Sequence, residues 1–358
     1  MLVVHQTTTA QLTTLPDGGN KKALVGERVG LTDITIHYSR PAVKGREGKI
    51  WGQLVPYGFS DQGFGTSKSA PWRAGANEGT TIEFSTDITI EGKNLPAGKY
   101  GFFIAPGKET STLIFSKNNT AWGSFFYDPS EDVLRVPCRQ QEMDKPVEYL
   151  QYVFTNQTIN SATIALQWEK WMFPFKVETD VKKEQLASFR KELQTEKGFN
   201  WQAFVQAANW CADNDTNLDE ALKWADNAIA GKFIGEKNFT TLSSKARILN
   251  LMGKSAEADA TMKEAIPLGT VAEVHGYARQ LLTAKKTSEA AAFFKANYKK
   301  YPNTFTTNMG MARALSSEGK YKEALKYAVA ALPQAPDDMN KSNVEKIIEK
   351  LKAGTDIN

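Results

Sequence analysis

Cysteine and histidine are scarce in this sequence of 358 residues, which holds two cysteines and three histidines. Cys138 and Cys211 lie far apart, so they form neither a dense disulfide framework nor the close pairs of a thiolate metal site. His5, His37 and His275 are too scattered for a zinc-binding motif. We therefore expect two buried free thiols, no metal site and no cofactor.

Charge imbalance and long apolar runs are also missing. Lys and Arg number 44 against 40 Asp and Glu, and a net charge of +4 gives neither a nucleic-acid footprint nor a polybasic membrane anchor. No apolar run approaches the roughly 20 residues that a membrane-spanning helix needs. The hydrophobic content of 41%, with 8 Trp and 19 Phe, suffices for packed cores. The length favours two domains.

Residues 1–29 are predicted to form an N-terminal extension. The apolar stretch at its start is too short for a complete signal peptide. Thr8-Thr9-Ala10-Gln11, however, has small residues of the kind that precede a signal-peptidase site. Two interpretations stay open, namely a remnant of an export signal and an ordinary frayed terminus.

Residues 30–178 alternate with a period of two, as in Ile34, Ile36 and Tyr38, which share one strand face. Turn residues such as Leu95-Pro96-Ala97-Gly98 separate the short runs, and no helical segment lies between them. This spacing indicates an antiparallel β-sandwich or a jelly-roll-like domain. The expected strands include 81–84, 87–90, 99–104, 112–116, 147–154 and 162–168.

Residues 179–358 change to a period of 3.6, and Asp180 is expected to cap a helix that runs to about Lys197. Four later helices open alike, with alanines at their starts that are separated by 37, 32 and 34 residues: Ala221, Ala258, Ala290 and Ala324. In the last unit, Gly319, Tyr321, Ala324, Ala331 and Pro336 have tetratricopeptide spacing. This region therefore resembles the tetratricopeptide family, which implies stacked helical hairpins.

The β region contains five phrases in a characteristic order: Ile36–Arg46, Trp51–Gly58, Trp72–Glu78, Leu95–Tyr100, and Trp122-Gly123 followed by Tyr127-Asp128. Together they resemble the bacterial domain-of-unknown-function family 2911, common in Bacteroidetes-type organisms, over about residues 30–178. The resemblance implies no established activity, and it implies a periplasmic or other extracytoplasmic location because members are often exported. An insertion at Ser60–Ala70 departs from the pattern, and we expect it to be a flexible loop.

Five polar residues of the β region form the first candidate site, here called the loop cluster: His37, Arg40, Arg73, Asn77 and Glu78. If the loop that contains Arg73 folds beside the strand of His37, these groups can bind a small anionic ligand. They can also support general acid–base chemistry of a hydrolase-like enzyme, although no catalytic residue is assigned. The alternative is a structural network in which Arg73 pairs with Glu78.

Aromatic residues in or beside loops offer a related hypothesis. Trp51, Trp72, Trp122 and Tyr127 can stack on the faces of sugars. The alternative is packing in the core or at the corners of the domain.

The second candidate site follows the helical repeats. Arginine follows a first-helix alanine in three units, at Arg247, Arg279 and Arg313, and the repeat pattern places this position on a concave groove. Trp210 is expected at the equivalent place of the first unit, and His275 lies one turn before Arg279. Such a basic column suits an acidic segment, a free C-terminal carboxylate or an anionic glycan. In the alternative, each arginine pairs with an acidic residue of a neighbouring helix.

These observations predict an exported, non-enzymatic binding or scaffold protein whose helical repeats bind a protein or peptide partner. The alternative is a small anionic ligand or carbohydrate binder, or a hydrolase-like enzyme, that acts at the loop cluster.

Overall fold

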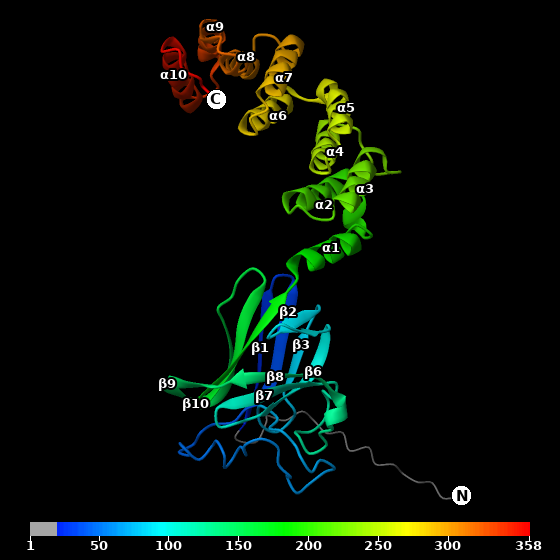
Figure 1. Ribbon diagram of the computed structural model, residues 1–358, viewed down its shortest axis with the longest axis vertical. Helices are drawn as coiled ribbons and strands as arrows, with labels where there is room; N and C mark the ends of the chain where they lie inside the picture. Colours follow the sequence, from blue (N-terminus) through cyan, green and yellow to red (C-terminus); the bar gives the residue numbers. More distant parts are fainter. Residues whose placement is uncertain (1–19) are drawn as a thin grey trace, which may run out of the picture. The chain divides into compact units, whose positions relative to one another are not determined.

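The computed structural model describes residues 20–358, which fall into two compact units (Figure 1). One unit extends to Ser188 and the other spans Phe189–Asn358. The small residues at Thr8–Gln11, which suggested an export signal, lie outside the described residues.

The described part of the first unit contains two antiparallel sheets. The larger sheet has the order β1-β2-β3-β6-β7-β8, formed by Lys21–Val29, Thr32–Arg40, Thr81–Phe84, Gly98–Ala105, Thr110–Ser116 and Asp132–Arg139. The smaller sheet has the order β5-β4-β10-β9, formed by Lys93–Leu95, Ile88–Ile90, Ser161–Thr179 and Gln141–Thr155. The predicted antiparallel β domain is thus confirmed, whereas its finer description as a sandwich or jelly roll stays a prediction.

One hydrophobic cluster draws on both sheets. Ile34 and Ile36 of β2 are buried in it, as the alternating pattern predicted, together with Trp168 and Phe175 of β10. His37 directly follows Ile36 in β2, so its side chain points to the opposite face of the sheet, where it is exposed. The alternation therefore sets which side chains of β2 reach solvent.

The N-terminal boundary of the β domain differs from the prediction. Residues 21–29 were assigned to the extension, but they form β1 and pair with β2 along its whole length. Most side chains of β1 are exposed or half-buried on both faces, as expected of an edge strand, so its alternation is weak. The short β5 and the strand β8 were not in the expected set either.

The helical region begins with α1, Val181–Glu192. Asp180 caps it as predicted, because Asp180 Oδ1 accepts the backbone N–H of Lys183 at 3.0 Å. The helix ends at Glu192 rather than near Lys197, and a separate 3₁₀ turn, η2, occupies Glu196–Gly198. Thr195 caps that turn through its side chain.

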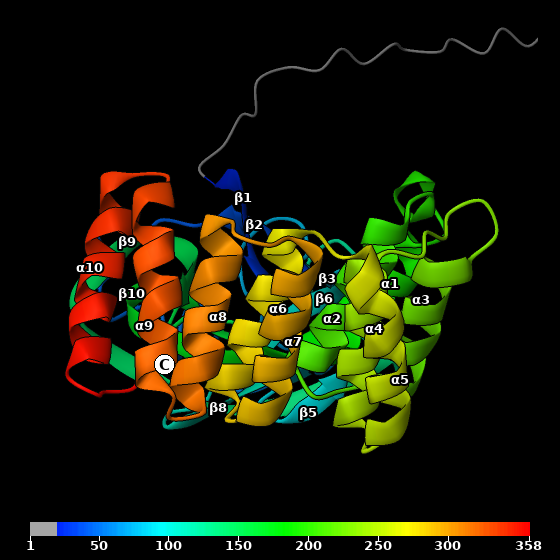
Figure 2. The same ribbon diagram turned by 90° about the horizontal axis from the view of Figure 1, so that it is seen from above.

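Four helical hairpins follow, and Figure 2 shows their helices from above. Their first helices are α2, Trp201–Asp213; α4, Phe239–Leu251; α6, Val271–Thr283; and α8, Phe305–Ser317. Their second helices are α3, Leu218–Ala230; α5, Ser255–Ala265; α7, Thr287–Lys300; and α9, Tyr321–Ala331. Helix α10, Asp338–Lys352, packs against α9. The hairpins confirm the tetratricopeptide-like repeat architecture.

The first helices share one register. Capping boxes at Asn238, Thr270 and Thr304 begin α4, α6 and α8, each of which has 13 residues. Each of these helices carries its buried alanine at the same distance from the cap: Ala246, Ala278 and Ala312. Each second helix also buries an alanine, at Ala221, Ala258, Ala290 and Ala324. Small side chains at both places allow the helices of a hairpin to pack closely.

Both cysteines are free and buried, as expected. Burial raises the pKa of Cys138 to about 12 and that of Cys211 to about 11, so neither thiol ionises readily near neutral pH. Across residues 20–358, no helix combines the length and apolar character that a membrane crossing requires.

The alanine contacts give a direct test of the hairpin packing. Because Ala290 and Ala324 are fully buried, Ala290→Phe or Ala324→Phe is expected to overpack the helix contact and lower the free energy of unfolding by about 1–3 kcal/mol. Chemical denaturation measures the change. Ala256→Phe, at an exposed position of α5, is the matched control and should have little effect. Equal stability of all three variants would contradict the packing.

Candidate functional site

The loop cluster does not act as one network in the structure. Glu78 Oε1 forms an ion pair with Lys22 Nζ at 2.6 Å, and Glu78 Oε2 accepts a hydrogen bond from Ser39 Oγ at 3.2 Å. Lys22 and Ser39 face each other across β1 and β2, so Glu78 pins its loop to this strand pair. The hydrogen bond from Lys22 lowers the pKa of Glu78.

Arg73 has other partners than the expected Glu78. Its Nη1 donates to the Asn77 carbonyl at 2.7 Å, and its guanidinium lies 5.0 Å from the centre of the Phe125 ring. A Cβ atom on Gly123 would lie 2.4 Å from Arg73 Nη1 and would displace the guanidinium, and the left-handed φ of 66° at Gly123 also favours glycine. Burial lowers the pKa of Arg73. This contact gives a physical reason for the Trp-Arg and Trp-Gly phrases of the sequence.

Of the remaining members of the loop cluster, Arg40 is held apart from the others, whereas Asn77 is joined to Arg73 through its carbonyl. Arg40 Nε donates to the Leu150 carbonyl at 2.8 Å, and the Arg40 guanidinium lies 5.8 Å from the centre of the Tyr149 ring. Asn77 has a left-handed backbone with φ of 58° and accepts a hydrogen bond from Asn20. In the structural alternative Arg73 would pair with Glu78, but the two side chains have other partners, and ligand binding by the loop cluster stays a prediction.

The four aromatic residues that were considered for sugar binding have different surroundings in the structure. Trp51 and Trp72 are half-buried, and each packs on the core residue Trp168, with ring centres 5.9 Å and 6.0 Å apart. These two residues therefore serve packing. Trp122 is exposed, whereas Tyr127 is buried and lines a pocket.

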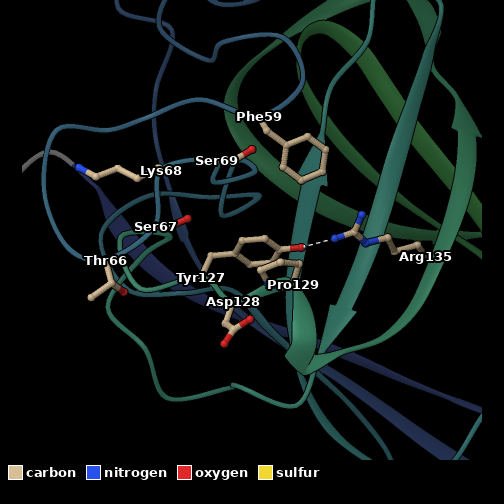
Figure 3. A pocket seen from close by; sticks show the side chains of 9 residues that line it. All are labelled: Phe59, Thr66, Ser67, Lys68, Ser69, Tyr127, Asp128, Pro129 and Arg135. Carbon is tan, nitrogen blue, oxygen red and sulfur yellow. Dashed lines mark hydrogen bonds between the residues drawn. The ribbon is translucent and has the colours of Figure 1, made fainter.

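The sequence patterns did not predict this pocket. It has a volume of about 590 Å³ and is here called the loop pocket (Figure 3). Its lining is polar and aromatic: Phe59, Thr66, Ser67, Lys68, Ser69, Tyr127, Asp128, Pro129 and Arg135. Four of these residues belong to the insertion, and Tyr127-Asp128 is one of the phrases noted above. The two regions are distant in sequence, so no local spacing could reveal that they meet.

One side of the loop pocket is a hydrogen-bonded triad. Tyr127 Oη donates to Asp132 Oδ2 at 2.6 Å, and Arg135 Nε donates to the same oxygen at 2.6 Å. Arg135 Nη2 also donates to Tyr127 Oη at 2.8 Å (Figure 3). Burial, and then the hydrogen bond to Asp132, raises the pKa of Tyr127. The Arg135 guanidinium also lies 5.6 Å from the centre of the Phe59 ring. The triad thus fixes Tyr127 as a neutral phenol and Arg135 as a cation at the wall.

The other side of the loop pocket is the insertion, Ser60–Ala70. Two backbone hydrogen bonds between Ser60 and Ala70 close its base, at 3.0 Å and 2.9 Å. The Ser67 N–H donates to the Phe125 carbonyl at 3.0 Å. A Cβ on Gly65 would lie 2.2 Å from that same oxygen, so the loop and residue 125 are in close contact. The insertion therefore forms one wall of the pocket through contacts of its own, and its flexibility stays a prediction.

In the helical unit, three of the predicted arginines occupy equivalent positions, directly after Ala246, Ala278 and Ala312. The first, Arg247, forms an ion pair with Asp213 of α2 at 2.6 Å. Both side chains are about half exposed, so this pair adds little stability. The alternative in which an acidic residue of a neighbouring helix neutralises each arginine therefore applies to Arg247.

Trp210 does not hold the place that was expected for it. In α2 the alanine at the equivalent position is Ala208, so the residue after it is Asn209. Asn209 Oδ1 accepts a hydrogen bond from Ser244 Oγ of α4 at 2.8 Å. Trp210 lies one position later and packs against Phe189, with ring centres 5.5 Å apart. The prediction was one residue off because the connection between α2 and α3 is one residue longer than the connections within the other hairpins. Counting back from the second-helix alanine therefore gives Trp210 instead of Asn209.

His275, Arg279 and Arg313 form a group of neighbouring basic residues, here called the basic cluster, in which the two arginines carry the positive charge. Arg279 lies close enough to Arg313 to lower its pKa, after the larger effect of burial. Burial, then Arg313, then Arg279 lowers the pKa of His275 to about 4. His275 packs on Phe294, with ring centres 5.2 Å apart, and its buried Nδ1 has no hydrogen-bond partner among the described residues.

Neutralisation of the basic cluster is uneven. Arg313 donates to the Ile357 carbonyl at 3.3 Å, and the nearby Asp356 raises its pKa. Within the described chain, Arg279 is exposed and forms no ion pair. The cluster therefore offers a free guanidinium beside a half-buried one. Residues 20–358 bring together no three His, Cys, Asp or Glu side chains that could hold a metal ion.

These features define a two-part protein, with an antiparallel β domain and a unit of tetratricopeptide-like hairpins. Residues 20–177 match the family model described as "Protein of unknown function (DUF2911)", which confirms the resemblance for the β domain. No curated protein matches the chain.

Solved structures similar to the chain include tetratricopeptide (TPR) proteins. YrrB, described as "a TPR protein with an unusual peptide-binding site", has 16% identity and a TM-score of 0.29, over 47% of this chain and 86% of that one. A "Podosopora anserina putative kinesin light chain" with nearly identical TPR-like repeats has 12% identity and a TM-score of 0.26, over 43% of this chain and 93% of that one. The repeat assignment itself rests on the helix register described above.

The position of His275 predicts a pH dependence of stability. Its pKa is about 4 when folded and 6.5 ordinarily, so below pH 6.5 the unfolded chain binds a proton that the folded chain does not. Stability should therefore fall as the pH decreases from about 6.5 towards 4. Between about pH 7 and pH 5 the loss is at most about 2 kcal/mol, because the ring is only partly buried.

Chemical denaturation across this pH range measures the effect. His275→Gln should reduce the pH slope relative to the wild type, while His37→Gln, at an exposed histidine of β2, is the matched control. An unchanged slope in His275→Gln would contradict a buried neutral imidazole beside two arginines.

Proposed function

We propose that the protein is a non-enzymatic scaffold whose helical unit binds an extended acidic segment of a partner protein at the basic cluster. The observation that carries this proposal is the proximity of Arg279 and Arg313. Two like charges on neighbouring first helices repel each other, and a carboxylate placed between them relieves that repulsion. Charge-assisted hydrogen bonds from arginine to carboxylate supply both affinity and orientation.

Helical repeats suit this role because each hairpin presents its first helix in the same register. The cluster lies on α6 and α8, which are in contact with each other. Its groups are therefore fixed by helix packing, so a ligand need not order a loop in order to bind.

An extracytoplasmic location is part of the proposal. Its support is the run of small residues at Thr8–Gln11 and the resemblance of the β domain to a family whose members are often exported.

Selection from a library of random peptides tests the binding proposal. The wild type is expected to enrich peptides that contain Asp and Glu, and Arg279→Glu should weaken a selected peptide by at least about tenfold through the loss of one charge-assisted contact. Lys326→Glu makes the same charge change on the exposed face of α9 and should retain binding. Selection without acidic enrichment, or with equal affinity in Arg279→Glu, would exclude the basic cluster as the site.

The loop pocket favours a second function for the β domain, the binding of a small anionic sugar. Its hydroxyl groups from Thr66, Ser67 and Ser69 can bond a polar ligand, and Lys68 and Arg135 supply positive charge. Lys68 is mostly exposed and is 3.4 Å from Asp61, so it is available to a ligand at small cost. Phe59 provides an apolar face for a sugar ring.

Calorimetric titration with glucuronate, glucose and acetate tests this second function. Glucuronate should bind more tightly than either of the others, because it alone combines a sugar ring with a carboxylate. Lys68→Gln should weaken it by about tenfold, whereas Lys108→Gln, on an exposed loop outside the pocket, should not. Absence of saturable glucuronate binding, or equal binding of acetate, would refute the assignment.

A further inference from the structure

The chain folds back onto its own basic cluster after α10. The Thr355 N–H donates to the Lys350 carbonyl at 2.9 Å at the end of that helix, and residues 356–358 then lie on α8. Residues 356–358 are here called the docked segment. They belong to the same compact unit as α8, so this contact is internal to one unit.

The docked segment makes the contacts of a bound peptide. Both backbone polar groups of Ile357 form hydrogen bonds to α8. The Ile357 N–H donates to Ser316 Oγ at 3.1 Å, and the Ile357 carbonyl accepts from Arg313 Nη1 at 3.3 Å. Asn358 Nδ2 donates to the Arg313 carbonyl at 3.1 Å. Asp356 Oδ1 accepts from Ser316 Oγ at 2.6 Å. Three consecutive residues thus engage two residues that are one helical turn apart.

Apolar burial fixes the position of the docked segment. Ile357 is 8% exposed and belongs to the hydrophobic cluster that includes Met309 and Leu315 of α8 and Ile348 and Leu351 of α10. Its neighbours Asp356 and Asn358 are exposed. The segment therefore has one buried apolar side chain between two polar ones, which is the pattern of a short extended peptide on a helical surface.

The docked segment neutralises the basic cluster only in part. Asp356 acts on Arg313 and raises its pKa, which partly offsets the effect of Arg279. Arg279 itself has no carboxylate partner in the described chain. The docked segment therefore covers one arginine of the basic cluster and leaves the other available.

We propose that the docked segment is an internal competitor that occupies part of the partner site, and that the partner segment has its chemistry: an acidic residue followed by a branched apolar residue. This inference rests on the proposed function of the basic cluster. A partner that uses Arg313, Ser316 and the Ile357 position must displace the docked segment, while Arg279 gives it a contact that the docked segment lacks.

Tethering explains why such a short segment can compete. A segment on a short linker experiences an effective concentration in the millimolar range, so a weak contact is still well populated. The apparent affinity of an external peptide then falls in proportion to the fraction of molecules whose site is open. Release of the docked segment should therefore raise the affinity for an external peptide without any change in the binding residues.

The test uses a fluorescein-labelled peptide with the sequence of residues 354–358, Gly-Thr-Asp-Ile-Asn, blocked at both ends, and the full chain. Ile357→Ser should bind the peptide at least about fivefold more tightly than the wild type, as measured by fluorescence anisotropy. Asp356→Lys, at an exposed position, should give the same gain without a change in the hydrophobic cluster. Met339→Ser, at an exposed apolar residue of α10, is the matched control and should behave as the wild type does.

The outcomes separate the two proposals. Equal peptide affinity in the wild type, Ile357→Ser and Asp356→Lys would overturn the competitor, even if acidic library peptides still bind through Arg279. A gain in both variants that Arg313→Ala abolishes would support it. An equal gain with a peptide of scrambled sequence would also overturn it, because the docked pattern would then have no role.

Discussion

Close packing at buried alanines is the constraint on which the helical unit depends. Ala246, Ala278 and Ala312 lie at the same position of three first helices, and all are buried. A larger side chain would hold the helices of a hairpin apart. Because each arginine directly follows such an alanine, the same packing that stabilises the hairpins also determines where the arginines lie. Structure and proposed binding site therefore share one cause.

The three arginines nevertheless have different electrostatic surroundings. Arg247 is neutralised at the surface by Asp213, and Arg313 is partly buried and held by residues 356–358. Arg279 is left exposed beside Arg313. Helix packing brings these two cations together, and Asp356 offsets only the charge of Arg313, so Arg279 is the arginine that the proposed partner can use. The two arginines also act on His275, because they add to the lowering of its pKa that burial causes.

The β domain uses its arginines differently. Arg40 and Arg73 donate to backbone carbonyls and lie over aromatic rings. Arg40 joins the end of β2 to β9, whereas Arg73 holds an irregular loop in place through the Asn77 carbonyl. In an irregular loop the backbone carbonyls lack ladder partners, and a guanidinium with several donors can satisfy them. The residue types of the loop cluster were therefore compatible with a ligand site, but their nearest acceptors were in the chain itself. The loop pocket formed elsewhere, from two segments that no spacing rule connects.

Local patterns in the sequence determined the two-part organisation, the core face of β2, the cap at Asp180, and the hairpins with their buried alanines. These features depend on periodicity and on contacts between near neighbours, which a sequence displays directly. The edge strand β1 was not predicted because exposure on both of its faces removes the alternation. Trp210 was misplaced because the connection between α2 and α3 is longer than in the other hairpins, which shifts the repeat count. Tertiary structure alone decided the partners of Arg73 and Glu78, the walls of the loop pocket, and the return of residues 356–358 to Arg313. Each of these joins segments whose meeting depends on the path of the whole chain, and side-chain chemistry specifies what a group can bind without specifying which group it will meet.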